Sequence, residues 1–247
     1  MTRFYVCAFG ALVIASAQTP GPMIVVSGAP YSGEQVTQRV ETSSDGTRTI
    51  RSLGSVKVYR DSAGRTRTER PPVTEIEDPV AGLRYRLDSS TTTARRWTLA
   101  PEQIISGDQA GSVVAVSTDK AVTFSIPAGG NSISVVLTVT PGGDAGAPQP
   151  KLTTDDLGTL KMEGVLVEGS RQSVTIPAGA QGSDRPITTV TDTWTSPELK
   201  IVMLSKVSDP RTGETTVTMT HLSRSEPALT LFQPGPDYKM VDGNAPQ

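Results

Sequence analysis

The stretch ITTVTDTWTSPELKIVMLSKV (residues 187–207), followed by DPRTG (209–213) and ETTVTMTHL (214–222), decides the fold. β-Branched residues dominate both long runs, as is typical of strands. Pro210 fixes φ early in a turn, and Gly213 suits the left-handed position that ends it. A turn of this kind between two strand-like runs predicts a long β-hairpin.

Three features inside and after this block refine the prediction. Ser196-Pro197-Glu198-Leu199 predicts one helical turn between strands, with Ser196 as its cap. Residues 200–204 (KIVML) are apolar on both faces, which indicates a central strand. Residues 226–238 are expected to close the domain, with Leu231 and Phe232 packed against it.

The first hundred residues repeat the alternation of strand and turn. Strands are expected at 34–42, 47–59, 65–70, 83–87 and 93–99, with turns at 45–46, 61–64 and 78–82. Residues 65–70 alternate Arg with Thr or Glu, which predicts an exposed strand whose charges discourage edge pairing.

The middle of the chain gives mixed signals. One helical turn is expected at 101–105, and a second, capped and ended by Gly158, at 153–158. Short strands are expected at 112–117, 121–126 and 132–140, a low-complexity linker at 141–150, and a strand pair at 160–168 and 169–176.

The N-terminus has the features of an export signal. Arg3 supplies the positive region, residues 4–15 form a short apolar core, and Ala15-Ser16-Ala17 is an A-x-A cleavage site. Removal of residues 1–17 takes away Cys7, the only cysteine, so the mature chain cannot form disulfides. We expect a periplasmic or secreted protein whose mature chain has no transmembrane span.

Composition and domain organisation agree with one β-rich unit. Aromatic residues make up only 4% of the chain and the formal net charge is −2. We predict an all-β, mainly antiparallel fold, a curved half-barrel sheet with little helix. The expected organisation is a signal peptide (1–17), a linker (18–32), one domain (33–240) with a flexible segment at about 100–150, and a disordered tail (241–247). No concentrated basic face indicates nucleic-acid binding.

Reactive groups are scarce in this chain. His221 is its one histidine, and no motif of a phosphate loop, zinc protease or calcium loop is present. We therefore expect no catalytic residues, no metal and no cofactor. One hypothesis for an activity is a hydrolase that uses His221. It requires a Ser and an Asp within hydrogen-bond reach of the imidazole.

A site without reactive side chains fits better. A curved sheet with little helix must either cover its concave face or leave it for a ligand. The candidates for a ligand-lining face are Val56, Val58, Trp194, Met203, Val217 and Met219. Thioethers adapt to irregular apolar guests, and Trp suits a rim between apolar and wet surfaces. The alternative is that these residues are ordinary core.

Several motifs carry a resemblance to known proteins. They are 153–158 (TTDDLG), 162–165 (MEGV), 175–179 (TIPAG), 194–199 (WTSPEL), 208–215 (SDPRTGET), 231–233 (LFQ) with 237–238 (DY) and, in the first half, 59–61 (YRD), 64–65 (GR), Arg70 and 78–82 (DPVAG). With them the chain resembles a family of secreted, β-rich bacterial proteins to which no activity is assigned. More distantly, it is similar to the half-barrel of outer-membrane lipoprotein carriers. That resemblance implies an open curved sheet whose apolar concave face holds acyl chains or a lipoprotein.

Two functions follow as hypotheses. The first is an exported, non-enzymatic binding protein whose concave face holds an apolar small molecule, a lipid or a lipidated partner such as a lipoprotein. The alternative is a periplasmic sensor or scaffold domain that docks a protein partner through its sheet, which a covered concave face and exposed apolar side chains would favour.

Overall fold

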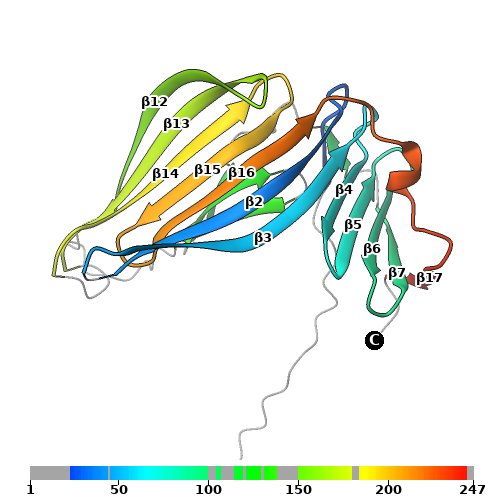
Figure 1. Ribbon diagram of the computed structural model, residues 1–247, viewed down its shortest axis with the longest axis horizontal. Helices are drawn as coiled ribbons and strands as arrows, with labels where there is room; N and C mark the ends of the chain where they lie inside the picture. The colour runs from blue at the N-terminus through cyan, green and yellow to red at the C-terminus, as the bar shows by residue number, and fades with distance from the viewer. Residues whose placement is uncertain are drawn as a thin grey trace, which may run out of the picture.

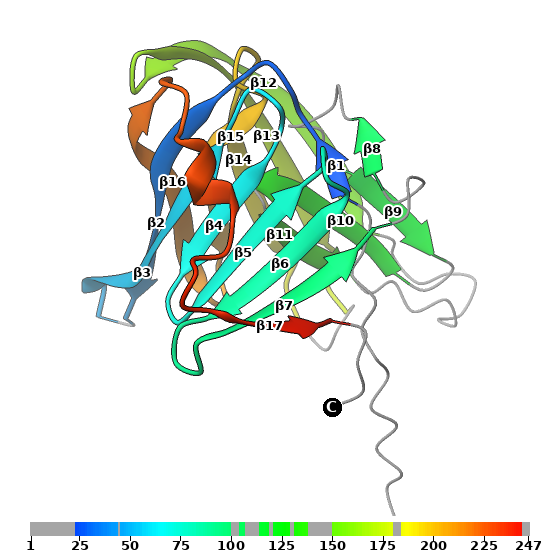
Figure 2. The same cartoon turned by 90° about the vertical axis from the view of Figure 1, so that its right-hand side faces the viewer.

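The computed structural model describes residues 23–43, 45–99, 104–106, 114–118, 121–128, 131–137, 150–179 and 184–243. Strands in this part of the chain form a 12-stranded sheet, a three-stranded sheet and a parallel pair. The large sheet is open and strongly curved, with its two limbs facing each other (Figures 1 and 2). The predicted fold class, an all-β curved half-barrel, is confirmed.

The large sheet follows the chain in two antiparallel blocks. In spatial order its strands are β12 (Lys151–Met162), β13 (Val165–Ile176), β14 (Ile187–Ser196), β15 (Ile201–Asp209), β16 (Gly213–Ser223), β2 (Tyr31–Thr42), β3 (Arg48–Arg60), β4 (Thr66–Arg70), β5 (Val73–Asp78), β6 (Leu83–Asp88), β7 (Thr93–Thr98) and β17 (Lys239–Asp242). The two blocks meet where β16 pairs with β2, and β17 is added to β7 in parallel. The C-terminal hairpin, β15 and β16, thus lies in the interior of the sheet, with strands on both sides.

A smaller sheet lies within the curve. It consists of β9 (Val114–Thr118), β10 (Ala121–Ala128) and β11 (Asn131–Leu137), and it has no ladder with the large sheet. Figure 2 shows these strands behind β4–β7, between the two limbs. β10 lies against β15. β1 (Met23–Val25) and β8 (Ile104–Ser106) form the separate parallel pair.

The convex side carries the single short helix described, η3 (Leu229–Phe232). Phe232 is buried against Ile76, Leu87 and Ala94 of β5–β7. Figure 2 shows η3 in front of β4, on the opposite side of the sheet from β9–β11. The predicted closing role of Leu231 and Phe232 is confirmed.

The turn chemistry of the central hairpin is as the sequence predicts. β15 ends and β16 begins at the paired residues Asp209 and Gly213, and Gly213 has a φ of +84°. The Asp209 carboxylate accepts a hydrogen bond from the Arg211 backbone N–H at 2.8 Å. Before β15, Ser196 Oγ accepts one from the Leu199 N–H at 3.2 Å, which confirms the predicted cap.

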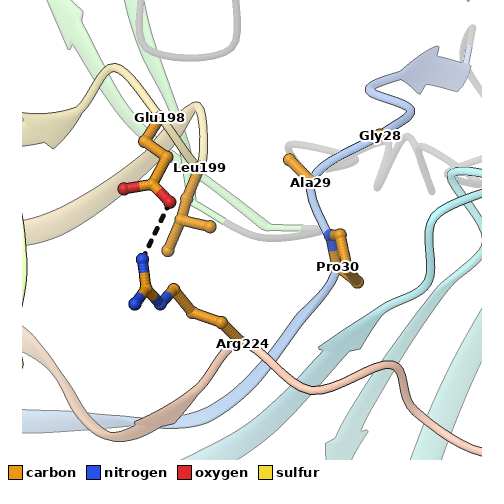
Figure 3. A pocket seen from close by; sticks show the side chains of 6 residues that line it. All are labelled: Gly28, Ala29, Pro30, Glu198, Leu199 and Arg224. Atoms are coloured by element: carbon orange, nitrogen blue, oxygen red, sulfur yellow. Dashed lines mark hydrogen bonds and ion pairs between the residues drawn. The ribbon is translucent and has the colours of Figure 1, made fainter.

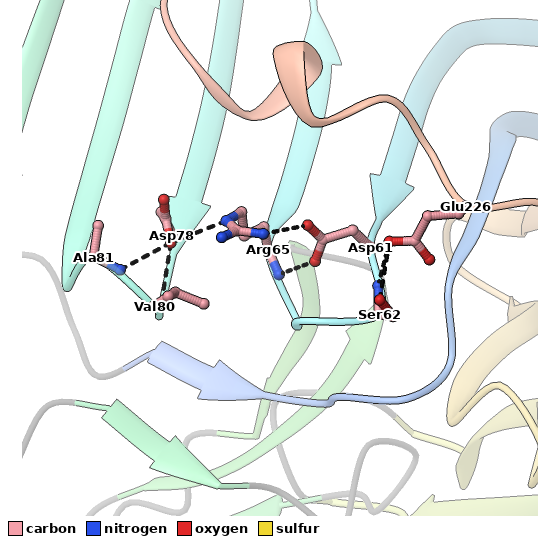
Figure 4. Close-up of polar contacts among 7 residues, drawn as sticks. All are labelled: Asp61, Ser62, Arg65, Asp78, Val80, Ala81 and Glu226. Carbon is pink, nitrogen blue, oxygen red and sulfur yellow. Dashed lines mark hydrogen bonds and ion pairs between the residues drawn. The ribbon is translucent and has the colours of Figure 1, made fainter.

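A polar network fixes the turns at one end of β3–β6 (Figure 4). Arg65 donates to the buried carboxylate of Asp61 at 2.8 Å, and its Nε lies 3.3 Å from Asp78. Asp78 also accepts hydrogen bonds from the backbone of its own turn. Glu226 accepts two bonds from Ser62, so the segment leading to η3 is tied to the same turns.

The prediction of an exposed strand at 65–70 is wrong. β4 lies inside the sheet, paired with β3 on one side and β5 on the other. The charges are tolerated because they are paired: Arg67 donates to Glu69 at 2.6 Å and to the Leu231 carbonyl at 2.8 Å. Thr68, between them, is buried.

The helical turn predicted at 153–158 is also wrong, since these residues belong to β12. The ladder between β12 and β13 shifts between Asp156 and Gly158, so the capping pattern forms a bulge instead of a helix. There Asp156 accepts a hydrogen bond from the Gly158 N–H at 2.7 Å. The turn between β12 and β13 lies at Glu163 and Gly164, which both adopt positive φ. The expected break between strands at 168–169 is absent, since these residues lie within β13.

Other boundaries differ from the expected ones. Residues 104–106 are extended as β8 where a helical turn was expected, and 100–103 lie outside the described residues. β1 lies within the stretch assigned to a linker, and residues 241–242 of the expected tail belong to β17. The signal segment 1–17, the linker 141–149 and residues 244–247 lie outside the described residues.

Candidate binding face

Strand register identifies which side chains point into the curve. Tyr59, Arg67 and Ile76 are paired across β3, β4 and β5, so they share a face. That face is the convex one, because Ile76 lies under Phe232. Val58 is one residue out of phase with Tyr59 and therefore points to the concave side.

The concave set extends across the central strands. Val56, two residues from Val58, is paired with Gln35, and Gln35 with Met219. Val217 lies two residues before Met219 and is paired with Ser205 of β15. Of the six predicted lining residues, Val56, Val58, Val217 and Met219 thus occupy one face.

A bulge decides the positions of the other two. The β14–β15 ladder pairs Trp194 with Leu204 but Thr195 with Val202, so Met203 is the extra residue. Met203 is buried in the same cluster as Val58 and Met219. Trp194 is half-buried and packs against the same cluster, and its ring lies against Gly169 of β13.

Burial divides the concave set into a packed end and a half-buried centre. Val58, Met203 and Met219 are at most 2% exposed and pack with Tyr31 and Leu199. Val56 and Val217 are half-buried. Three of the predicted lining residues are therefore core in this conformation.

Polar side chains lie between these apolar ones. Gln35, Thr193 and Ser205 are buried on the concave face. Ser205 Oγ has no hydrogen-bond partner within the part of the chain that the structure describes. An unpaired buried hydroxyl costs free energy.

The cover of this face is the small sheet, whose β10 lies against β15. The backbone of β10 is paired antiparallel with β9 on one side and with β11 on the other.

A buried arginine closes the end of the cluster. Arg60 is 4% exposed, and its Nε and Nη2 donate to the Ala29 carbonyl at 3.0 and 2.7 Å. Nη2 also donates to the Leu199 carbonyl. Burial lowers the pKa of Arg60 and raises that of Tyr31 beneath it. Carbonyl oxygens, and no carboxylate among the described residues, hold this cation.

A small pocket lies over these carbonyls (Figure 3). Its volume is about 190 Å³, and it is lined by Gly28, Ala29, Pro30, Glu198, Leu199 and Arg224. Arg224 donates to Glu198 at 2.9 Å, and both side chains are exposed. Ligand pockets usually measure about 300–1,000 Å³, so this one is too small for an acyl chain.

The remaining candidate chemistry does not assemble into a site. His221 is 82% exposed, and its Nδ1 lies 3.6 Å from Glu34, while no serine–histidine bond is formed within the described ranges. The same ranges contain no group of three His, Cys, Asp or Glu side chains that could hold a metal ion.

Among the described residues, none of the helical structure is long and apolar enough to cross a bilayer.

Comparisons with known proteins found similar structures but no similar sequences. No protein-family model and no curated protein sequence matches the chain. Similar solved structures include the MucA/MucB complex of Pseudomonas aeruginosa, with 13% identity over 86% of this chain and a TM-score of 0.34. The match covers 58% of the length of the matched chain in that complex.

Two further similar structures are lipoproteins. The hypothetical lipoprotein YmcC of Escherichia coli matches 80% of this chain and 86% of its own, at 12% identity and a TM-score of 0.28. Lipoprotein LppX of Mycobacterium tuberculosis matches 79% and 88%, at 10% identity and a TM-score of 0.25.

Sequence reasoning missed two parts of this face. Arg60 belongs to the motif 59–61 (YRD), and nothing in the local pattern signals that backbone carbonyls surround it. The cover had a signal only as three short strands, expected at 112–117, 121–126 and 132–140. That signal did not say where the small sheet packs.

Proposed function

We propose that this protein is an exported, non-enzymatic half-barrel that binds an apolar ligand, a lipid or the acyl chain of a lipidated partner on its concave face. One observation carries the proposal: Val56 and Val217, at the centre of the concave face, are only half-buried, and the small sheet beside them shares no hydrogen-bonded ladder with the large one. A guest can therefore occupy this face without breaking the large sheet.

The chemistry of the face suits such a guest. Met203 and Met219 provide flexible thioethers next to Val56 and Val58. An apolar chain that leaves water for this face gains roughly 25 cal/mol per Å² of its own buried surface.

Native mass spectrometry with lipid extraction is the first test. The protein, purified gently from the cell envelope, should carry a stoichiometric lipid or acylated peptide. The same spectra give the N-terminus, which the export hypothesis places at Gln18. A clean apo mass together with no uptake of a fluorescent fatty acid would refute the proposal.

A pair of variants locates the site. Val217→Glu puts a charge on the half-buried centre of the concave face and should weaken fatty-acid binding at least tenfold. Thr216→Glu, next to it on the opposite face, should leave binding unchanged. Equal effects of the two variants would place the ligand elsewhere.

A further inference from the structure

Part of β3 has a neighbour on one side only. β3 pairs with β2 along its whole length but with β4 only through Lys57–Arg60. In the described part of the chain, residues 48–55 therefore have a backbone edge that no strand occupies. Figure 1 shows this part of β3 as the free lower border of the sheet. Its outward N–H and C=O groups can pair with an added strand.

The side chains on this edge are exposed, and they include both apolar and basic groups. Ile50 is 67% exposed and Leu53 57% exposed. Arg48 and Arg51 are exposed too, and neither forms an ion pair with any described residue. Successive strand residues alternate between faces, so the two guanidiniums project on opposite sides of the edge.

The other edges of the sheet are better protected. β12 carries Asp155, Asp156 and Lys161, and a bulge interrupts it at Leu157. Charges and bulges of this kind prevent strand addition. β17 is only Lys239–Asp242. Residues 48–55 contain no proline and no acidic residue, and their ladder to β2 is regular as far as Ser52.

Charge selects the partner. Two copies of this edge would bring four arginines into one ladder, which disfavours self-pairing. An acidic strand would instead place carboxylates opposite Arg48 and Arg51, and an apolar residue beside Ile50. A membrane surface would leave the backbone groups of the edge unpaired, which is costly in an apolar medium.

We propose that β3 accepts an extended acidic segment of a partner protein as an added strand along residues 48–55. Main-chain hydrogen bonds supply the affinity, and the arginines select the charge and register of the segment. This site is separate from the concave face, so each proposal can fail without the other.

The test uses a labelled peptide, Thr-Glu-Val-Thr-Glu-Val-Thr, whose glutamates are spaced like Arg48 and Arg51. Fluorescence anisotropy with the full chain should show saturable binding, and the double variant Arg48→Glu/Arg51→Glu should weaken it at least tenfold. The matched control, Lys151→Glu/Lys161→Glu on β12, exchanges the same number of charges and should bind as the unchanged protein does. Unchanged circular dichroism and unfolding midpoints confirm that both variants fold.

A second peptide separates strand addition from simple charge attraction. N-methylation at alternate residues removes the N–H groups of the pairing edge while all charges are kept. The proposal predicts at least a tenfold loss of affinity for this peptide. Equal binding of both peptides, or no binding of the first, would overturn it. So would binding to anionic phosphatidylglycerol vesicles that depends on Ile50 and Leu53 while the peptide is ignored.

Discussion

The guanidinium of Arg60 lies over the ring of Tyr31, 4.8 Å from its centroid, with both residues buried at the end of the apolar cluster. The arrangement links the segment before β2 to the turn before β15, since Arg60 donates to the carbonyls of Ala29 and Leu199. A buried cation held by carbonyls and a ring is a cross-link between elements far apart in the chain.

Removal of this cross-link should destabilise the protein strongly. Arg60→Ala leaves two buried carbonyls without donors, and each such loss costs about 1–3 kcal/mol. We expect the free energy of unfolding in urea to fall by about 3 kcal/mol or more. Arg224→Ala breaks only an exposed ion pair nearby and should cost less than about 1 kcal/mol. Equal effects of the two substitutions would show that Arg60 is not a cross-link.

The packing of the η3 segment against the sheet should depend mainly on the side chain of Phe232. Phe232 is 1% exposed against Ile76, Leu87 and Ala94, so Phe232→Ala leaves a cavity and should cost about 3–5 kcal/mol. Leu229 begins the same short helix and is 54% exposed. Leu229→Ala should therefore change the unfolding free energy by no more than about 0.5 kcal/mol. Thermal and urea unfolding of both variants give the comparison.

A glycine pair separates backbone strain from steric clash. Gly164 and Gly213 have φ of +80° and +84°, so alanine at either costs about 1–2 kcal/mol. At Gly164 an added Cβ meets open space, whereas at Gly213 it meets the Val40 carbonyl oxygen. Gly213→Ala should therefore be worse by a further 1–3 kcal/mol or so. Equal unfolding free energies would mean that β2 gives way at Val40.

The fold was predictable where turn chemistry and strand alternation agree. Around Asp209 and Gly213, proline, aspartate and glycine all favour one turn, and the structure contains it. At 153–158 the same local signals favoured a helical cap. The prediction failed because pairing with β13 stabilises an extended strand more than one isolated turn is stabilised by a cap.

The candidate face was predictable only in part, and the reason is geometric. Alternation within one strand correctly grouped Val56 with Val58 and Val217 with Met219. It cannot give the phase of one strand relative to another, and the bulge at Met203 changes that phase between β14 and β15. The cover could not be placed because packing of one sheet on another leaves no periodic trace in either.

In acid, the free energy of unfolding should depend on Asp209, which lies in the turn between β15 and β16. The side chain of Arg211 donates to its carboxylate at 3.0 and 2.7 Å, which holds the pKa of Asp209 at about 2, below the ordinary 3.8. Because the folded state favours the ionised form, the stabilisation is complete above pH 4 or so. It is lost as the pH falls toward about 2.

Asp209→Asn should therefore be less stable than the unchanged protein at pH 5, and the difference should vanish by about pH 2. Urea unfolding of both proteins from pH 5 to pH 2 measures this convergence. In an Arg211→Ala background the pH dependence should shrink, because the strongest donor to the carboxylate is gone and only the backbone N–H and Thr189 remain. A difference that stays constant with pH would instead assign the effect of Asp209→Asn to lost turn geometry, since that geometry does not titrate.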